Sequence, residues 1–417
     1  MVKECFKKSL NSRKNIFSRV QKIMIMFIIT LLALPSIYGE SYLYTNSSKV
    51  KDESSISTIA PPKFALKSKA QILMEASTGT VIYANNENEK LLPASVTKIM
   101  TLLLTMEAID AGKIKYTDMV TCSENAASMG GSQIWFKPGE KLTVDDALKA
   151  VCVVSANDVS IALGEMIGGT EGNFVNMMNE KAKELGMTNT NFVNTHGIDE
   201  AEHYTSAKDI AIMSRELINN HPNILKYTSI WMDTIRGGTF GLSNTNKLIR
   251  FYDGAVGLKT GSTDKALFNL SAVAKRDGMM LIAVVMTAPS SDIRNDECKQ
   301  LLDYGFANYK VDKLAPKNKV MGEIVINKNI EQKLKVITKD EAAILSEKGQ
   351  SKEYTEKVNI DKKLSLPIVK GQKVGSLVYL NKNGEKKVQV DIIADSSMKE
   401  SGIKEYILKS LKLYVMK

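Results

Sequence analysis

The strongest constraint on the fold is a run of apolar segments that follows Gly237-Gly238. Each segment has the composition of a strand, and a turn containing Gly or Asp separates it from the next. Strands joined by short turns pair antiparallel, so the region predicts an antiparallel sheet. The expected strands are residues 247–252, 258–260, 268–275 and 280–286, and residues 301–309 are expected to form a closing helix.

The preceding part of the chain mixes one strand pair with helices. Residues 70–83 read as a β-hairpin that turns at Ser77-Thr78-Gly79. Residues 94–108 are rich in apolar helix formers and follow Pro93, a helix start signal, and residues 144–154 and 158–166 predict two more helices. The expected fold class is α+β, in which an antiparallel sheet flanked by helices packs beside a helical lobe with the active cleft between them.

The C-terminal part changes character near residue 311. Residues 311–397 consist of short alternating runs with turns such as Asn383-Gly384, which predicts a small all-β domain. Residues 398–417 are expected to contain an amphipathic helix with lysines around one apolar face, suited to lying in a membrane surface. A helix docked on the β-domain is the alternative. The apolar face consists of Ile403, Tyr406, Ile407, Leu411, Tyr414 and Val415.

The N-terminus has the pattern of a secretory signal. Basic residues precede an apolar run at residues 23–34, too short to span a bilayer comfortably, and small residues follow. Residues 1–39 are therefore expected to be a signal peptide, with an uncleaved anchor as the alternative. Residues 40–62 are Ser-rich, charged and closed by two prolines, which predicts a linker. The first folded domain is expected at residues 63–310.

Charge and cysteine content exclude several classes of protein. The formal net charge is +10, but residues 1–39 contribute six of these units, and no basic block interleaved with aromatic residues occurs elsewhere. A nucleic-acid partner is therefore not expected. Beyond the expected signal, Cys122, Cys152 and Cys298 are widely spaced and odd in number, so buried free thiols are expected and neither a disulfide framework nor a metal site is predicted.

The chemistry suggested by the sequence depends on lysine. Only three histidines occur and no Gly-x-Ser-x-Gly motif is present, so a Ser-His-Asp hydrolase has little support. In Ser95-Val96-Thr97-Lys98 a helix places residues i and i+3 on one face, and a desolvated lysine beside another cation can act as a base. Ser155-Ala156-Asn157 and Lys259-Thr260-Gly261 follow in order.

With these three motifs the chain resembles the low-molecular-weight penicillin-binding proteins, the serine D-alanyl-D-alanine carboxypeptidases of peptidase family S11. Supporting stretches cover most of residues 65–310, including MEASTGTVIYANNENEKLLPASVTKIMT at 74–101 and NFVNTHGID at 191–199. The resemblance implies a β-lactamase/transpeptidase-like fold that needs no metal and no cofactor. It also implies peptidoglycan stem peptides as substrates and β-lactams as covalent inhibitors.

The resemblance also implies a role for each motif residue. Ser95 would be the nucleophile and Lys98 its general base, while Ser155 relays a proton to the departing D-alanine and Asn157 positions Lys98 and the substrate amide.

The third motif would bind the substrate. Lys259 and Thr260 of the Lys-Thr-Gly motif, which ends at Gly261, would receive the terminal carboxylate, and the backbone N–H groups of Ser95 and Ser262 would form the oxyanion hole. Arg294 is a further candidate for facing that carboxylate.

Three alternatives remain open on the sequence. A secreted serine β-lactamase shares all three motifs, but residues 189–200 lack the Glu-x-x-x-Asn pattern of a deacylating base. A non-catalytic peptidoglycan-binding scaffold would not need every motif residue. Transpeptidase or endopeptidase activity passes through the same acyl-enzyme. An exported enzyme at the outer face of the cytoplasmic membrane is expected.

Overall fold

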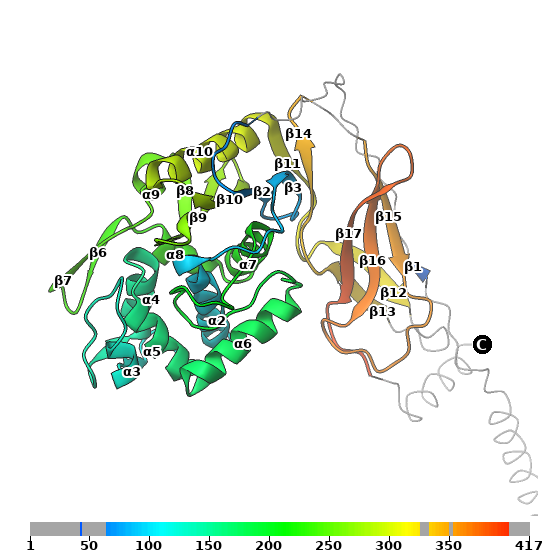
Figure 1. Cartoon of the computed structure of the whole chain (residues 1–417). Helices are drawn as coiled ribbons and strands as arrows, with labels where there is room; N and C mark the ends of the chain where they lie inside the picture. Colours follow the sequence, from blue (N-terminus) through cyan, green and yellow to red (C-terminus); the bar gives the residue numbers. More distant parts are fainter. Residues whose placement is uncertain (1–41, 44–63, 326–332, 350–352, 400–417) are drawn as a thin grey trace, which may run out of the picture. The chain divides into compact units, whose positions relative to one another are not determined.

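The computed structural model describes residues 42–43, 64–325, 333–349 and 353–399, which divide into two compact units. The described residues of Val50–Ala315 and Ala342–Tyr354 form the larger unit. The smaller unit contains Pro316–Glu341 and the described part of Thr355–Lys417 (Figure 1).

The larger unit is built on a five-stranded antiparallel sheet in the order β3-β2-β10-β9-β8. Strands from the beginning and the end of the unit's sequence lie side by side in the middle of the sheet, where Ile72 of β2 pairs with Val284 of β10. The predicted antiparallel sheet and opening hairpin are therefore confirmed. The strands are β2 (Ala70–Glu75), β3 (Val81–Asn85), β8 (Ala255–Thr263), β9 (Leu267–Arg276) and β10 (Met279–Ala288).

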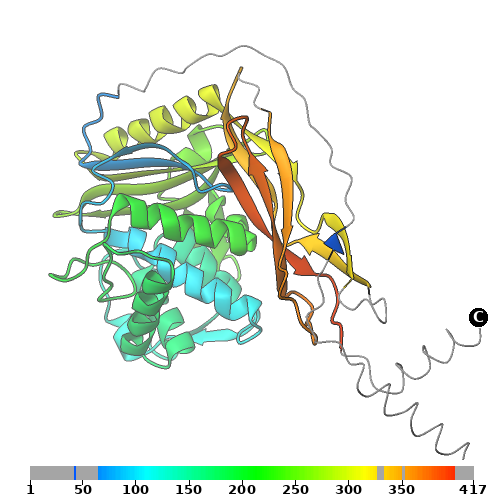
Figure 2. The ribbon, with the colours of Figure 1, turned by 90° about the vertical axis from the view of Figure 1, so that its right-hand side faces the viewer.

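Helices cover both faces of this sheet because successive side chains of each strand point to opposite sides. Ile72 belongs to an apolar core shared with α7 (Ala207–Asn220), whereas Leu73 belongs to a separate core shared with α10 (Ser291–Asn308). Figure 2 shows the yellow α10 on one side of the strands and green helices on the other. The predicted closing helix is present and begins ten residues earlier than expected.

The first of these cores extends into the helical lobe. Ser95 and Lys98 lie where a 3-10 turn, η1, passes into α2, and the second motif lies between α4 and α5. The remaining elements of the larger unit are η1 (Ala94–Thr97), α2 (Lys98–Asp110), β4 (Met119–Thr121), α3 (Glu124–Ala127), β5 (Lys141–Thr143), α4 (Val144–Val153), α5 (Asn157–Gly168), α6 (Glu171–Glu184), η2 (Pro222–Ile224), α8 (Leu225–Thr228), β6 (Met232–Ile235), β7 (Phe240–Ser243), α9 (Leu248–Phe251), β11 (Tyr309–Ala315) and β14 (Ala342–Glu347).

The strand expected at residues 247–252 is wrong, because this segment forms the short helix α9. Asn246 explains the difference: its Oδ1 accepts the Leu248 N–H at 3.1 Å, a local side-chain bond that starts a turn. The three described cysteines, Cys122, Cys152 and Cys298, are buried and free, as expected.

The smaller unit is a β-domain, as its alternating sequence predicted. Its antiparallel sheet has the order β1-β12-β13-β17-β16-β15, so Tyr42–Leu43, within the expected linker, add a short strand beside β12. The amphipathic helix was predicted within residues 398–417, of which residues 400–417 lie outside the described residues, as does the expected signal. The strands are β1 (Tyr42–Leu43), β12 (Val320–Val325), β13 (Lys333–Thr338), β15 (Thr355–Ile360), β16 (Lys373–Leu380) and β17 (Lys386–Ala394).

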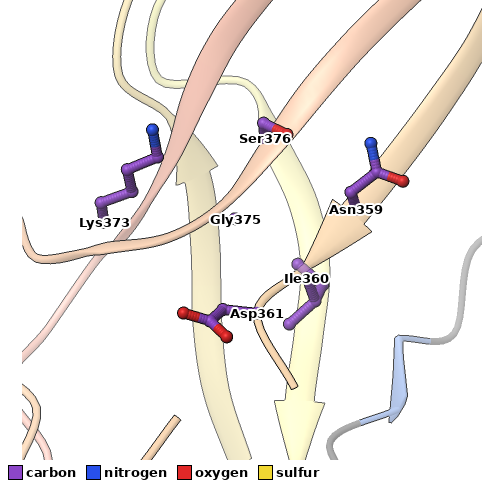
Figure 3. Close-up of a pocket in the computed structure, with 6 residues that line it drawn as sticks. All are labelled: Asn359, Ile360, Asp361, Lys373, Gly375 and Ser376. Carbon is purple, nitrogen blue, oxygen red and sulfur yellow. The ribbon is translucent and has the colours of Figure 1, made fainter. Parts of the chain in front are cut away.

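A pocket lies along β15 and β16 (Figure 3). The strands approach closely at Gly375, where a Cβ would lie 2.3 Å from the Asn359 carbonyl oxygen. None of the residues that line the pocket belongs to the three motifs. The lining residues are Asn359, Ile360, Asp361, Lys373, Gly375 and Ser376. Across the described part of the chain, no helix combines the length and apolar character needed to cross a membrane.

Candidate active site

Ser95 sits on a tightly held turn at the start of the central helix. Ala94, just before it, has a positive φ of 49°. Asn269 of β9 donates from Nδ2 to the carbonyl oxygens of Leu92 and Pro93, at 2.9 and 3.0 Å. The sheet therefore fixes the backbone that presents a half-buried Ser95 side chain.

Lys98 is fully buried, and three oxygens surround its amine. The Nζ atom lies 2.9 Å from Ser95 Oγ, 2.6 Å from Asn157 Oδ1 and 2.7 Å from the His196 carbonyl oxygen. A neutral amine has two N–H bonds and one lone pair. Because Asn157 and His196 present acceptors with no proton to give, the lone pair is left for the Ser95 hydroxyl.

Electrostatics favour that neutral form of Lys98. Burial lowers the pKa of Lys98 well below its usual range, and the nearby charge of Lys259 lowers it further, against a smaller opposing effect of Asp158. The Asp158 carboxylate is hydrogen-bonded elsewhere, since its Oδ2 accepts the Ile134 and Phe136 N–H groups. The amine can therefore accept a proton near neutral pH.

The second motif, Ser155-Ala156-Asn157, contacts Lys98 through Asn157. Ser155 is buried with a positive φ of 63°, a conformation that costs a non-glycine residue energy. Among the described residues its Oγ is one of the buried side-chain polar atoms without a protein partner. Asn157 is anchored by Nδ2 to the Gly130 carbonyl and by its N–H to the Ser132 carbonyl, both at 2.7 Å. Ser155 therefore combines a strained backbone with a buried hydroxyl that has no protein partner, and it lies two residues before the anchored Asn157.

The third motif lies on β8, the edge strand of the sheet, so half of its backbone groups point away from β9. A Cβ at Gly261 would lie 2.9 Å from the Ser95 nitrogen, so only glycine allows this approach to the nucleophile turn. Thr260 Oγ1 lies 2.7 Å from Thr245 Oγ1, and Ser262 is exposed. Beside the Ser95 turn, the motif residues Lys259, Thr260 and Gly261 are therefore buried, and Ser262 is exposed at the edge.

Lys259 and Arg294 are two further buried basic side chains near the motifs. Both are buried, and Lys259 donates from Nζ to the Thr260 carbonyl oxygen at 2.9 Å. Burial lowers the pKa of Lys259 to about 7, and the charge of Arg294 adds to this effect against the opposing Cys152. Arg294 donates from Nε and Nη2 to Asn295 Oδ1, at 3.1 and 3.0 Å. Buried basic side chains of this kind are suited to receiving a carboxylate, whose charge favours their protonated form.

One part of the site was not predicted from the sequence, namely the loop that supplies the His196 carbonyl. The N–H groups of His196 and Gly197 donate to Asn194 Oδ1 at 3.3 and 2.6 Å, which fixes that carbonyl against Lys98. A Cβ at Gly197 would lie 1.8 Å from the Ala94 carbonyl oxygen. The Asn-Thr-His-Gly segment is recognisable, but a backbone acceptor leaves no mark of its own in a sequence.

Comparisons with known proteins agree with this geometry. Residues 56–290 match the model of the peptidase S11 family, D-alanyl-D-alanine carboxypeptidase, and residues 309–400 match that of the penicillin-binding protein 5 C-terminal domain. The chain is 42% identical over 353 residues to D-alanyl-D-alanine carboxypeptidase DacF of Bacillus subtilis (strain 168), an alignment covering 84% of this chain and 90% of the relative.

Solved structures also resemble the chain, over different lengths. Penicillin-binding protein 5 from Haemophilus influenzae matches with a TM-score of 0.68 and 32% identity, over 82% of this chain and 100% of that one. Penicillin-binding protein D2 from Listeria monocytogenes, in its ampicillin-bound form, matches with a TM-score of 0.54 and 29% identity, over 59% of this chain and 99% of that one. The three motifs, the contacts among their side chains and these matches together place the chain in the peptidase S11 family of D-alanyl-D-alanine carboxypeptidases.

Proposed function

We propose that this chain is a serine D-alanyl-D-alanine carboxypeptidase that removes the terminal D-alanine from peptidoglycan stem peptides through an acyl-enzyme. The observation that carries the proposal is the buried Lys98 amine, 2.9 Å from Ser95 Oγ, with Asn157 Oδ1 and the His196 carbonyl oxygen at 2.6 and 2.7 Å as acceptors for its N–H bonds. This arrangement makes Ser95 a nucleophile without a histidine.

In acylation the Ser95 hydroxyl gives its proton to Lys98 Nζ, and Oγ attacks the carbonyl carbon between the two D-alanines. The carbonyl oxygen becomes an oxyanion, for which the backbone N–H groups of Ser95 and Ser262 are the proposed donors. When the C–N bond breaks, the departing amine needs a proton. Ser155 relays it from Lys98, which suits a buried hydroxyl that has no other partner in the described structure.

Lys259, Thr260 and Arg294 are the proposed receptors of the substrate carboxylate. Lys259 titrates near pH 7, so an incoming carboxylate would favour its protonated form and gain a charge-assisted bond. This requirement restricts the enzyme to peptides with a free C-terminus. Water then attacks the acyl-enzyme, Lys98 takes its proton, and Ser95 is released.

The relatives favour this function over the alternatives. Relatives aligned over most of this chain, from Bacillus, Haemophilus and Escherichia, are named D-alanyl-D-alanine carboxypeptidases, which supports neither a β-lactamase nor an inert scaffold. The Listeria penicillin-binding protein D2 was solved with ampicillin bound, and by similarity we propose that β-lactams acylate Ser95 here.

The test is release of D-alanine from a peptide ending in D-Ala-D-Ala, measured with the wild-type chain and with Ser95→Ala. Release by the wild type alone supports the proposal. Equal release by both proteins, or turnover of penicillin much faster than turnover of the peptide, would contradict it.

We further propose that the chain is exported, with residues 1–39 as its signal, and that it works at the outer face of the cytoplasmic membrane. The N-terminus, in which basic residues precede an apolar run, and the amphipathic pattern of residues 398–417 support this location. Co-sedimentation with anionic liposomes, with and without residues 399–417, tests the membrane contact. Binding that survives the truncation would argue against the tail as anchor.

A further inference from the structure

An exposed tryptophan is held beside the active site by bonds that fix its backbone. The Trp135 side chain is exposed, with 65% of the residue accessible, and its φ is +54°, a conformation rarely adopted by large side chains. Its neighbours Ile134 and Phe136 both donate N–H groups to the buried Asp158 carboxylate. The backbone is therefore fixed in a strained form that keeps the indole in water.

The β6–β7 hairpin contacts the indole through Phe240. Phe240, at the start of β7, meets Trp135 edge to face with ring centroids 6.0 Å apart. Arg236 stacks its guanidinium on Phe240, 5.2 Å from the ring centroid, and donates from Nη1 to the Ile134 carbonyl oxygen at 2.8 Å. Glu140 fixes Arg236 through Nε at 2.7 Å. The two rings thus form an organised pair next to the turn that joins β6 and β7. These two strands form a ribbon that projects from the larger unit (Figure 1).

This ring pair is close to the catalytic residues. The Ser132 carbonyl accepts the Asn157 N–H, and only three residues separate Ser132 from Trp135, so their Cα atoms are at most about 11 Å apart. In a stem peptide, four residues lie between the scissile bond and the sugar that carries the peptide. Fully extended, they span about 14 Å. A stem peptide that extends from Ser95 past Asn157 and Ser132 therefore carries its sugar toward Trp135.

The size and chemistry of the pair indicate the ligand. Two rings are too small for a stable protein interface, which buries roughly 800 Å² on each partner. A flat indole beside the charged Arg236 and Glu140 suits a small amphipathic ring, which has C–H groups on its faces and polar groups at its rim.

We propose that Trp135, supported by Phe240, is a binding site for an N-acetylhexosamine ring of the glycan strand. The site selects stem peptides that are still attached to sugar. This inference rests on the proposed function, since it extends the substrate of the same cleft.

The kinetic test compares D-alanine release from a free pentapeptide and from the same pentapeptide attached to its disaccharide. The proposal expects wild type to prefer the sugar-bearing substrate in kcat/KM, and Trp135→Ala to reduce that preference roughly five- to tenfold, the effect of one lost stacking contact. Met232→Ala is the matched control, because Met232 is as exposed as Trp135, at 68%, and lies on β6, the strand paired with the Phe240 strand β7. A preference that Trp135→Ala leaves unchanged would overturn the proposal, as would a loss of the same size with Met232→Ala.

A binding measurement separates this proposal from the catalytic one. The chain has two tryptophans, so Trp231→Phe leaves Trp135 as the sole indole fluorophore. In Ser95→Ala/Trp231→Phe protein, saturable quenching by N-acetylglucosamine oligomers supports the site even if the wild type releases no D-alanine. Catalysis without such quenching overturns the sugar site and leaves the proposed function standing. Quenching by the free pentapeptide instead would assign Trp135 to the peptide and refute the sugar assignment.

Discussion

Replacing Lys259 by methionine is expected to stabilise the protein at neutral pH while abolishing substrate capture. Burial lowers the pKa of Lys259 from its ordinary 10.5 to about 7. A tenfold change in an equilibrium constant corresponds to about 1.4 kcal/mol, so the protonated lysine destabilises the folded chain by about 5 kcal/mol. The lost hydrogen bond to the Thr260 carbonyl offsets about 1–2 kcal/mol of the gain. The net stabilisation by Lys259→Met is about 3 kcal/mol at pH 7.

The effect has a defined pH dependence. Between pH 7 and 10.5 the unfolded lysine binds a proton that the folded one has lost, so wild-type stability rises with pH across this window. Below pH 7 the penalty of the buried charge is fully present. The advantage of Lys259→Met should therefore be largest at pH 6–7 and vanish by about pH 10.

Urea unfolding at several pH values measures this difference. Tryptophan fluorescence follows the larger unit, because Trp135 and Trp231 both lie in it. Lys265→Met, which removes an exposed lysine from the turn after β8, is the control and should show no such pH dependence. A variant Lys259→Met that is less stable than wild type at pH 7, or a difference that stays constant from pH 6 to 10, would refute the reasoning.

Three further predictions concern the nucleophile turn. Lys98→Met should slow acylation by penicillin about 10²–10⁴-fold, the usual contribution of a positioned base, and mass spectrometry of the acyl-enzyme over time measures it; acylation at the wild-type rate would exclude Lys98 as the base. In the wild type, the acylation rate should fall as pH drops through the lowered pKa of Lys98, because the protonated amine cannot accept the Ser95 proton, and a rate that increases toward acid pH would contradict this assignment. Gly197→Ala should lower the free energy of unfolding by more than about 3 kcal/mol in urea, since its Cβ would lie 1.8 Å from the Ala94 carbonyl oxygen. Gly112→Ala, also at positive φ but with open space around it, should cost about 1 kcal/mol. Equal costs would refute the steric argument.

Local elements, and the pairings that follow from spacing, can be predicted from the amino-acid sequence. The i and i+3 positions of Ser95 and Lys98 predict two side chains on one turn, and the structure has them 2.9 Å apart. Apolar segments separated by Gly- or Asp-containing turns likewise predicted the sheet of the larger unit, and short alternating runs predicted the separate β-domain. These features depend on neighbours within a few residues, so residue identity and spacing are enough to indicate them.

The surroundings of the catalytic pair depend on contacts that only the folded chain makes. The His196 carbonyl that contacts Lys98 comes from 98 residues away, and Asn157 comes from 59 residues away. The positive φ of Ser155 is likewise a property of packing. Backbone acceptors, strained torsions and the burial that lowers a lysine pKa all arise from long-range contacts, which residue identity and spacing do not encode. The sequence therefore indicates which groups react, whereas the charge that each of them carries is set by the packing of the fold around it.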